Sequence, residues 1–266
     1  MIRDITLGQY YPADSVLHRL DPRVKLFGTL IYVISLFLFQ SFTGYIVATV
    51  FLATIIILSR VPISFMVKGL RAVMILLIFT AVLNAFLTPG RTLVSFWKIN
   101  ITIEGVRLAA FMVVRLVYLI VGSSILTLTT TPSDLTDGLE KGLGWLKAFR
   151  VPVSEIAMMM SIALTFIPVL LEETDRIIKA QQARGADFDS GNIIRRVKAL
   201  IPILVPLFVS AFRRANDLAL AMESRCYRGG EGRTKLYPLK YTLRDVIAYA
   251  VLALYLVLII TVGFLL

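Results

Sequence analysis

The chain has 266 residues, of which 58% are hydrophobic and 17% are charged, and its mean hydropathy is +0.81. A soluble domain is about half apolar and about one quarter charged, so this composition excludes an ordinary soluble fold and predicts an integral membrane protein. One cysteine and one histidine exclude an internal disulfide and a metal site built from such residues, and no cofactor is expected. The formal charge of +11 indicates basic residues gathered on the cytoplasmic side of a membrane, so no nucleic acid is expected as a partner.

Five apolar runs predict transmembrane helices. They cover roughly 24–40, 45–59, 69–88, 106–130 and 246–266. One straight helix through the first two runs would be about 54 Å long, which is too long for a single crossing, so a tight turn is expected at Gly44. The segment 89–105 is rich in turn-forming residues and is expected to be a loop.

The basic residues predict how these helices are oriented. Arg19, Arg23 and Lys25 precede the first run, so the N-terminus is expected in the cytoplasm, and the uncharged break at 41–44 is expected outside. Five crossings then place the C-terminus outside. The Asp-Pro pair before Arg23 suits a helix start, and Arg23 and Lys25 are expected to bind anionic lipid headgroups. The expected location is therefore the inner or plasma membrane, crossed several times.

The segment between the fourth and fifth runs is too charged for plain spans and too apolar for a free soluble domain. The expected parts are an N-terminal membrane region with four helices, a central region and a final span, with boundaries at 1–130, 131–240 and 241–266. A short helix is predicted near 133–147 and two long helices near 153–184 and 192–225. Each long helix is apolar first and polar in its last part, and each would be about 45 Å long. Hinges are expected at the internal prolines Pro168, Pro202 and Pro206.

The two long helices end on the same short pattern, an arginine between two small residues. The residues are Ala183, Arg184 and Gly185 in the first helix and Ser224, Arg225 and Cys226 in the second. A cation and a following glycine also suit a plain helix end. Small neighbours, however, leave each arginine unshielded, and its planar donor fork fits carboxylates or the carbonyls of a partner helix. The pattern therefore predicts two docking points for a cytoplasmic partner.

Four longer motifs resemble one known family. They are LDPRVKL at 20–26, TTTPSDLTDGLEKGLGWLK at 129–147, EIAMMMSIALTFIPVLLEETDRIIKAQQARGADF at 155–188 and AMESRCYRGG at 221–230. The chain resembles, over essentially its full length, the transmembrane component EcfT of energy-coupling factor (ECF) transporters, a branch of the ABC importers for vitamins and metal ions. The resemblance implies an all-α integral membrane protein with about five transmembrane helices. A pair of long coupling helices on the cytoplasmic side, within 131–230, would be inserted before the last span.

The resemblance also implies partners and site residues. The two arginine motifs would each reach into a groove of one of two cytoplasmic ATPase subunits, and Cys226 departs from the glycine common at that place in the family. A separate membrane subunit, the S component, would capture the micronutrient and contact the apolar part of the first long helix. The residues expected at that contact, which could equally be ordinary core, are Met158, Met159, Met160, Ile162 and Phe166.

Two other functions are weighed against this one. A conventional ABC permease with its own substrate path would place ionisable groups in its spans, and Arg115 is the main example here. A membrane-embedded transferase would need clustered acids, and Glu172, Glu173 and Asp175 form the one tight acidic group. The glycine-rich stretch 229–233 lacks the lysine and hydroxyl residue of a phosphate-binding loop, so the chain is not expected to be an enzyme that hydrolyses ATP.

Overall fold

The computed structural model describes residues 10–38, 41–96, 99–186, 188, 193–230, 236 and 238–265. These residues fall into two compact units. The first, here called the core unit, comprises Gly8–Lys141 and Leu239–Leu266. The second, here called the helix-pair unit, contains Gly142–Pro238.

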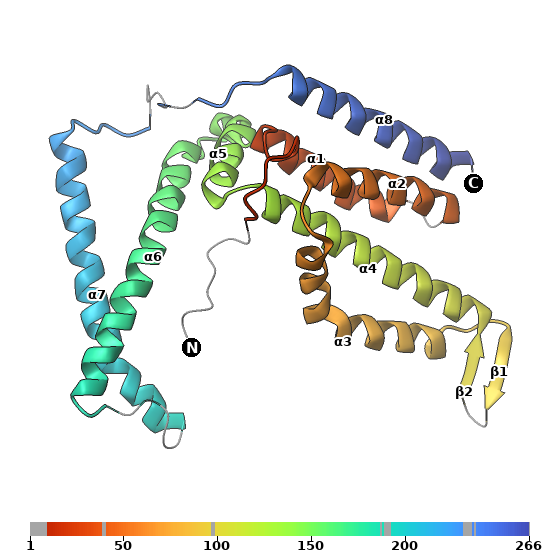
Figure 1. Cartoon of the computed structure of the whole chain (residues 1–266), viewed down its shortest axis with the longest axis horizontal. Helices are drawn as coiled ribbons and strands as arrows, with labels where there is room; N and C mark the ends of the chain where they lie inside the picture. The colour runs from red at the N-terminus through yellow and green to blue at the C-terminus, as the bar shows by residue number, and fades with distance from the viewer. Residues whose placement is uncertain are drawn as a thin grey trace. The chain divides into compact units, whose positions relative to one another are not determined.

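The described residues are almost entirely helical, as expected (Figure 1). The core unit holds α1 (Pro22–Leu38), α2 (Phe42–Ser59), α3 (Ile63–Leu87), α4 (Ile103–Thr129), α5 (Pro132–Gly142, its last residue across the boundary) and α8 (Leu243–Leu265). The helix-pair unit holds a 3-10 helix η1 (Gly144–Phe149), α6 (Val153–Ala183) and α7 (Ile193–Ser224). The segment 89–105, expected to be a loop, instead contains an antiparallel hairpin of β1 (Thr92–Phe96) and β2 (Ile99–Thr102).

Several helices have the length and hydropathy of membrane spans. Among the described residues these are Phe42–Ser59, Ile103–Thr129, Val153–Ala183, Lys198–Ser224 and Leu243–Gly263. The bent helix α3 adds a sixth if its two parts form one span, and α1 has only 17 residues. A multi-pass helical membrane protein is thus confirmed. The candidate spans differ from the expected set because α6 and α7 also qualify by length and composition.

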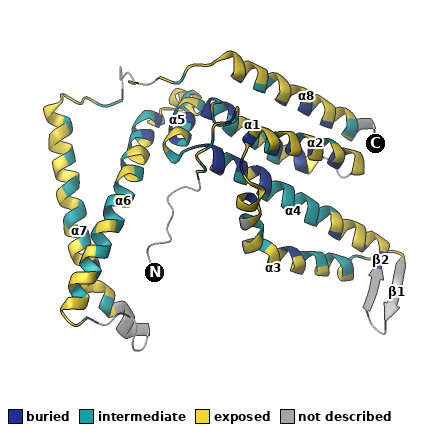
Figure 2. Cartoon of the chain, in the orientation of Figure 1, coloured by how far each residue is buried: buried dark blue, intermediate teal, exposed yellow. Residues whose placement is uncertain are grey.

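The core unit buries its interior between α1, α2, α4 and α8, with Met66 from the start of α3. The Phe51 and Tyr255 rings stack at 4.0 Å, and the Tyr255 hydroxyl is 2.7 Å from the Ser35 hydroxyl. A Cβ on Gly122 would lie 2.3 Å from the Tyr32 ring, so only glycine lets α4 approach α1 this closely. Apolar side chains such as Ile75 remain exposed on the outer faces, which Figure 2 shows in yellow, as expected of surfaces that face lipid.

A buried polar cluster, the α1–α8 junction, ties the start of α1 to the start of α8. Asp245 is 1% exposed, and its carboxylate accepts bonds from the backbone N–H of Asp21 (2.8 Å) and of Thr242 (2.7 Å). It also accepts from the Thr242 hydroxyl at 2.8 Å, so it caps α8 while holding α1. Arg23 forms a two-pronged pair with Asp21 at 3.1 Å and lies over the Tyr241 ring.

Two basic residues expected at lipid headgroups are therefore bonded inside the fold. Arg23 belongs to the α1–α8 junction. The Lys25 ammonium donates to the carbonyl oxygens of Thr129 (2.9 Å) and His18 (3.2 Å). Because Thr129 is the last residue of α4, Lys25 supplies a cation and a donor to a helix C-terminus.

His18 is held by hydrogen bonds through both of its ring nitrogens. Its Nε2 lies 3.0 Å from the Tyr11 carbonyl oxygen, so it must carry the proton and donate, and the Ser15 hydroxyl then donates to Nδ1 at 2.6 Å. Partial burial lowers the pKa of His18 below its ordinary value, and the nearby charge of Lys25 acts in the same direction. The neutral ring is therefore the form that the fold favours.

Candidate docking site on the paired helices

The two long helices of the helix-pair unit lie side by side and run in opposite directions (Figure 1). The Gln181 amide donates to the Pro202 carbonyl at 3.2 Å, and Arg214 pairs with Glu173 at 3.3 Å. The backbone N–H of Gly230 donates to Glu155 at 3.2 Å. The partner's residue number falls as the α6 number rises, so the pairing is antiparallel.

The bond between Gln181 and Pro202 repairs a defect that proline creates. In a regular helix the Pro202 carbonyl would accept the N–H of residue 206, but Pro206 has no N–H. The Gln181 side chain supplies the missing donor from the neighbouring helix. Pro168, Pro202 and Pro206 all lie inside continuous helices, and their role as hinges stays a prediction.

The first helix end has a complete hydrogen-bonded cap. Gly185 adopts a left-handed conformation with φ 85°, and its N–H donates to the Gln182 carbonyl at 2.9 Å. The N–H of Ala186 reaches back to Gln181 at 3.0 Å. These two bonds form the Schellman motif, which satisfies carbonyls that a helix end would leave open. Arg184 takes part through its backbone N–H, so its guanidinium is not used by the cap.

The second helix end repeats the same arrangement. Cys226 is left-handed with φ 57°, and its N–H donates to Glu223 at 2.8 Å. The N–H of Tyr227 reaches Met222 at 3.1 Å, and Arg225 occupies the position that Arg184 has in α6. The repeat seen in the sequence is thus a repeat in backbone geometry. We call the two ends, residues 183–185 and 224–226, the arginine tips.

Both arginine tips face outward. All six residues are exposed, and within the described part of the chain neither guanidinium forms a hydrogen bond or ion pair. Their local geometry is that of helix C-caps, which was one of the two expected readings. The charged side chains are nevertheless spare, because the caps are made by backbone groups alone.

The arginine tips lie toward opposite ends of the helix pair. Arg184 is 29 residues beyond Glu155, or ~43 Å along a straight α6 at 1.5 Å per residue. Arg225 is five residues before Gly230, which bonds to Glu155, and five residues span at most ~18 Å. The Glu155 side chain and its bond to Gly230 add up to roughly 9 Å, so the separation is at least ~15 Å. This arrangement was not predicted from the sequence.

The residues expected at an S component form no buried core in this chain. Met159 and Met160 are exposed, whereas Met158, Ile162 and Phe166 are partly exposed. The facing helix α7 also exposes apolar side chains, among them Phe208 and Phe212. These apolar side chains of α6 and α7 therefore remain wholly or partly exposed on the helix pair.

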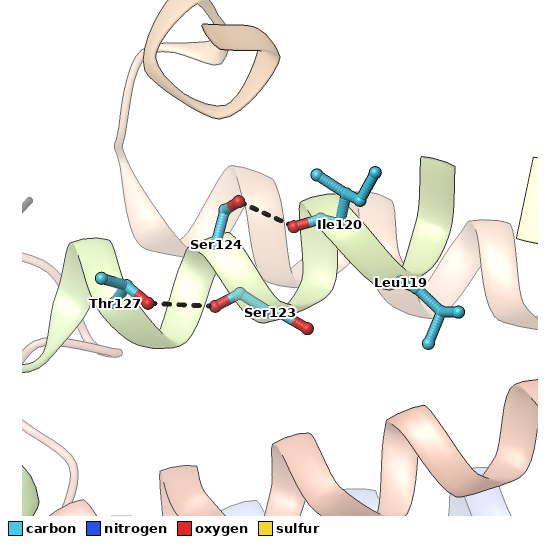
Figure 3. A pocket seen from close by; sticks show the side chains of 5 residues that line it. All are labelled: Leu119, Ile120, Ser123, Ser124 and Thr127. Carbon is cyan, nitrogen blue, oxygen red and sulfur yellow. Dashed lines mark hydrogen bonds between the residues drawn. The ribbon is translucent and has the colours of Figure 1, made fainter. Parts of the chain in front are cut away.

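A shallow depression of about 350 Å³ lies on α4, in the core unit. It is lined by Leu119, Ile120, Ser123, Ser124 and Thr127 (Figure 3). Two of its hydroxyls already donate to carbonyls of their own helix, Ser124 to Ile120 at 2.7 Å and Thr127 to Ser123 at 3.5 Å. With no ionisable side chain in its lining, the depression offers little that could recognise a polar solute.

The ionisable residues behind the two alternative functions have structural partners. The Nε of Arg115 donates to the Tyr45 hydroxyl at 3.2 Å, and its guanidinium lies 5.4 Å from the centre of the Phe37 ring. Glu173, from the acidic group on α6, pairs with Arg214 on α7. No cluster of three or more potential metal ligands occurs among the described residues.

Sequence reasoning did not identify Gln181 as a contact residue, although the pair of prolines on α7 indicates a carbonyl without its helical donor.

Comparison with known proteins identifies related chains. The model of the family described as cobalt transport protein, CbiQ, matches residues 13–236. The chain is 56% identical over 250 residues to the energy-coupling factor transporter transmembrane protein EcfT of Clostridium kluyveri, with 93% of each chain covered. It is 52% identical over 261 residues to the protein of the same description from Brevibacillus brevis, with 98% of each chain covered. The relative from Ruminiclostridium cellulolyticum is 52% identical over 247 residues, with 93% of this chain and 92% of that one covered.

Proposed function

Because the chain belongs to the EcfT family of energy-coupling factor transporter transmembrane proteins, we propose that it joins two cytoplasmic ATPase subunits to a substrate-binding S component. It is a transport protein and not an enzyme, so ATP hydrolysis is assigned to the partner subunits. ATP-driven motion of those subunits would be passed to the S component to import a vitamin or another micronutrient.

The observation that carries this proposal is the pair of arginine tips. Both present a spare guanidinium on a rigid, backbone-capped helix end, which suits insertion into a groove lined by carboxylates or helix carbonyls. Their positions toward opposite ends of the helix pair suit two binding sites on two separate subunits. Residues 183–185 would bind one ATPase and residues 224–226 the other.

The remaining surface of the helix pair is assigned to the S component. Met159 and Met160 are exposed, and methionine side chains adapt to surfaces of different shape. The bonds from Gln181 to Pro202 and from Arg214 to Glu173 hold α6 to α7, so a displacement of either tip would move the pair together. Bending at the three internal prolines would direct that movement.

The membrane orientation is part of the same proposal. The N-terminus is assigned to the cytoplasm of a cell inner or plasma membrane because basic residues precede α1, and five crossings would then place the C-terminus outside. In this proposal α6 and α7 lie on the cytoplasmic side, although their length and composition would also suit spans, so both arginine tips face cytoplasmic subunits.

Replacing Arg184 and Arg225 together by alanine tests the proposal. The double variant should lose ATPase subunits when the complex is purified in mild detergent, because each docking contact loses its charged donor. The matched control is Arg176→Ala with Arg213→Ala, which removes two exposed arginines that precede the tips in the same helices. The control should keep its ATPase subunits. Retention of both subunits and of normal transport by the tip variant would refute the docking role.

A further inference from the structure

The short helix η1 carries an exposed aromatic pair that the proposed coupling function does not use. Trp145 is 62% exposed and Phe149 is 71% exposed, and their rings meet edge to face at 6.0 Å. Leu143, just before η1, is also exposed. The two rings contact each other but stay exposed, so together they form an apolar surface. Such a surface is stabilised when a lipid or another protein covers it.

The same turn carries an excess of positive charge. Lys147 and Arg150 are exposed, and neither forms an ion pair within the described residues. The stretch 141–154 contains three basic residues and no acidic residue. Tryptophan beside lysine and arginine is the composition of segments that lie at a membrane surface, where rings enter the headgroup region and cations meet lipid phosphates.

Arg150 occupies a backbone position that favours glycine. Its φ is 62°, and its N–H donates to the Leu146 and Lys147 carbonyls, so it ends η1 in the left-handed conformation. Arginine is disfavoured there relative to glycine or asparagine. Because arginine is strained at this turn, its presence next to exposed aromatic rings indicates that its charge has a function there.

Chain connectivity links this turn directly to α5. Only Leu143 separates η1 from α5, and two residues separate α5 from the end of α4. Within the core unit α5 packs on the start of α1, where a Cβ on Gly138 would lie 2.9 Å from Pro22. The turn is thus joined by one residue to a helix that packs within the core unit.

We propose that η1 and Arg150 form an interfacial anchor. Trp145 and Phe149 insert among the headgroups of the leaflet, and Lys147 and Arg150 bind anionic phospholipid phosphates. This anchor holds the chain at the membrane surface between α5 and α6. It is independent of the ATPase docking assigned to the arginine tips.

Tryptophan fluorescence tests the anchor in the full-length protein. The chain has two tryptophans, so the Trp97→Phe variant reports on Trp145 alone. It is reconstituted in phosphatidylcholine vesicles with and without phosphatidylglycerol, and quenching is compared between lipids brominated high and low on their acyl chains. The shallow label should quench more strongly than the deep one. Quenching should also increase with phosphatidylglycerol.

Removing the charge provides the second arm. Lys147→Gln with Arg150→Asn keeps a residue suited to the left-handed turn and should reduce the phosphatidylglycerol-dependent quenching roughly fivefold or more. Arg176→Gln with Arg213→Gln, an equal loss of two charges from α6 and α7, should leave it unchanged. Emission typical of water, with no quenching by either brominated lipid, would overturn the proposal. So would shielding of Trp145 that appears only when partner proteins are co-reconstituted, because a polypeptide would then be the occupant.

Discussion

The two arginine tips differ at the residue that follows each arginine. Gly185 and Cys226 both have positive φ, at 85° and 57°. A side chain in this conformation costs about 1–2 kcal/mol, and glycine avoids that cost. A Cβ added at Gly185 would meet nothing within 4 Å, so the backbone conformation alone decides the difference there. The second tip therefore has backbone strain at Cys226, which the first tip avoids because it has glycine at that position.

This difference predicts opposite effects of two single substitutions. Cys226→Gly should raise the free energy of unfolding by about 1 kcal/mol, and Gly185→Ala should lower it by about the same amount. Denaturant titration of the detergent-solubilised protein measures both. If Cys226→Gly destabilised the chain, the cysteine side chain would have to contribute a contact that outweighs its backbone strain.

At the scale of the helix, the contact between α6 and α7 depends on a carbonyl that proline leaves open. Gln181→Leu removes the donor to the Pro202 carbonyl and should cost about 1 kcal/mol. Pro206→Ala restores the helical N–H, so in that background Gln181→Leu should cost little. A double-mutant cycle of unfolding free energies measures the coupling. If Gln181→Leu cost the same in both backgrounds, the Gln181 amide would not be replacing the N–H that Pro206 lacks.

The α1–α8 junction is the second element-scale contact that can be tested. Asp245→Asn replaces one accepting oxygen with an amide that cannot accept, which leaves a buried N–H unpaired and should cost about 2–3 kcal/mol. Asp14→Asn is the matched control, because Asp14 pairs with Arg19 at 3.2 Å in an exposed position and should cost less than about 1 kcal/mol. Thermal or chemical unfolding of both variants compares them. Similar small effects would mean that the junction does not secure α8.

For the whole molecule, local sequence signals predicted the helices well and their assembly poorly. The long helices expected at 153–184 and 192–225 are found at Val153–Ala183 and Ile193–Ser224, because helix ends depend on nearby residues such as Gly185. The hairpin was not predicted because the turn-forming residues in 89–105 indicated a loop, and the two strands between them are short. The antiparallel pairing of α6 with α7 was also missed.

Long-range contacts explain what the sequence could not reveal. Asp21 and Asp245 are separated by 224 positions, and no local pattern indicates that they meet. The six residues of the arginine tips were identified because small residues around an arginine at a helix end form a local pattern. Their placement toward opposite ends of the pair depends on contacts such as Gln181 with Pro202, which only the folded chain brings together.

The central claim is that each arginine tip binds its own cytoplasmic ATPase subunit. A photo-crosslinking amino acid placed first at position 184 and then at position 225, in the assembled complex in its native membrane, tests this directly. The account predicts that each position captures an ATPase subunit, with the two products distinguishable if the subunits differ. Capture of lipid or of this same chain alone, from either position, would contradict it.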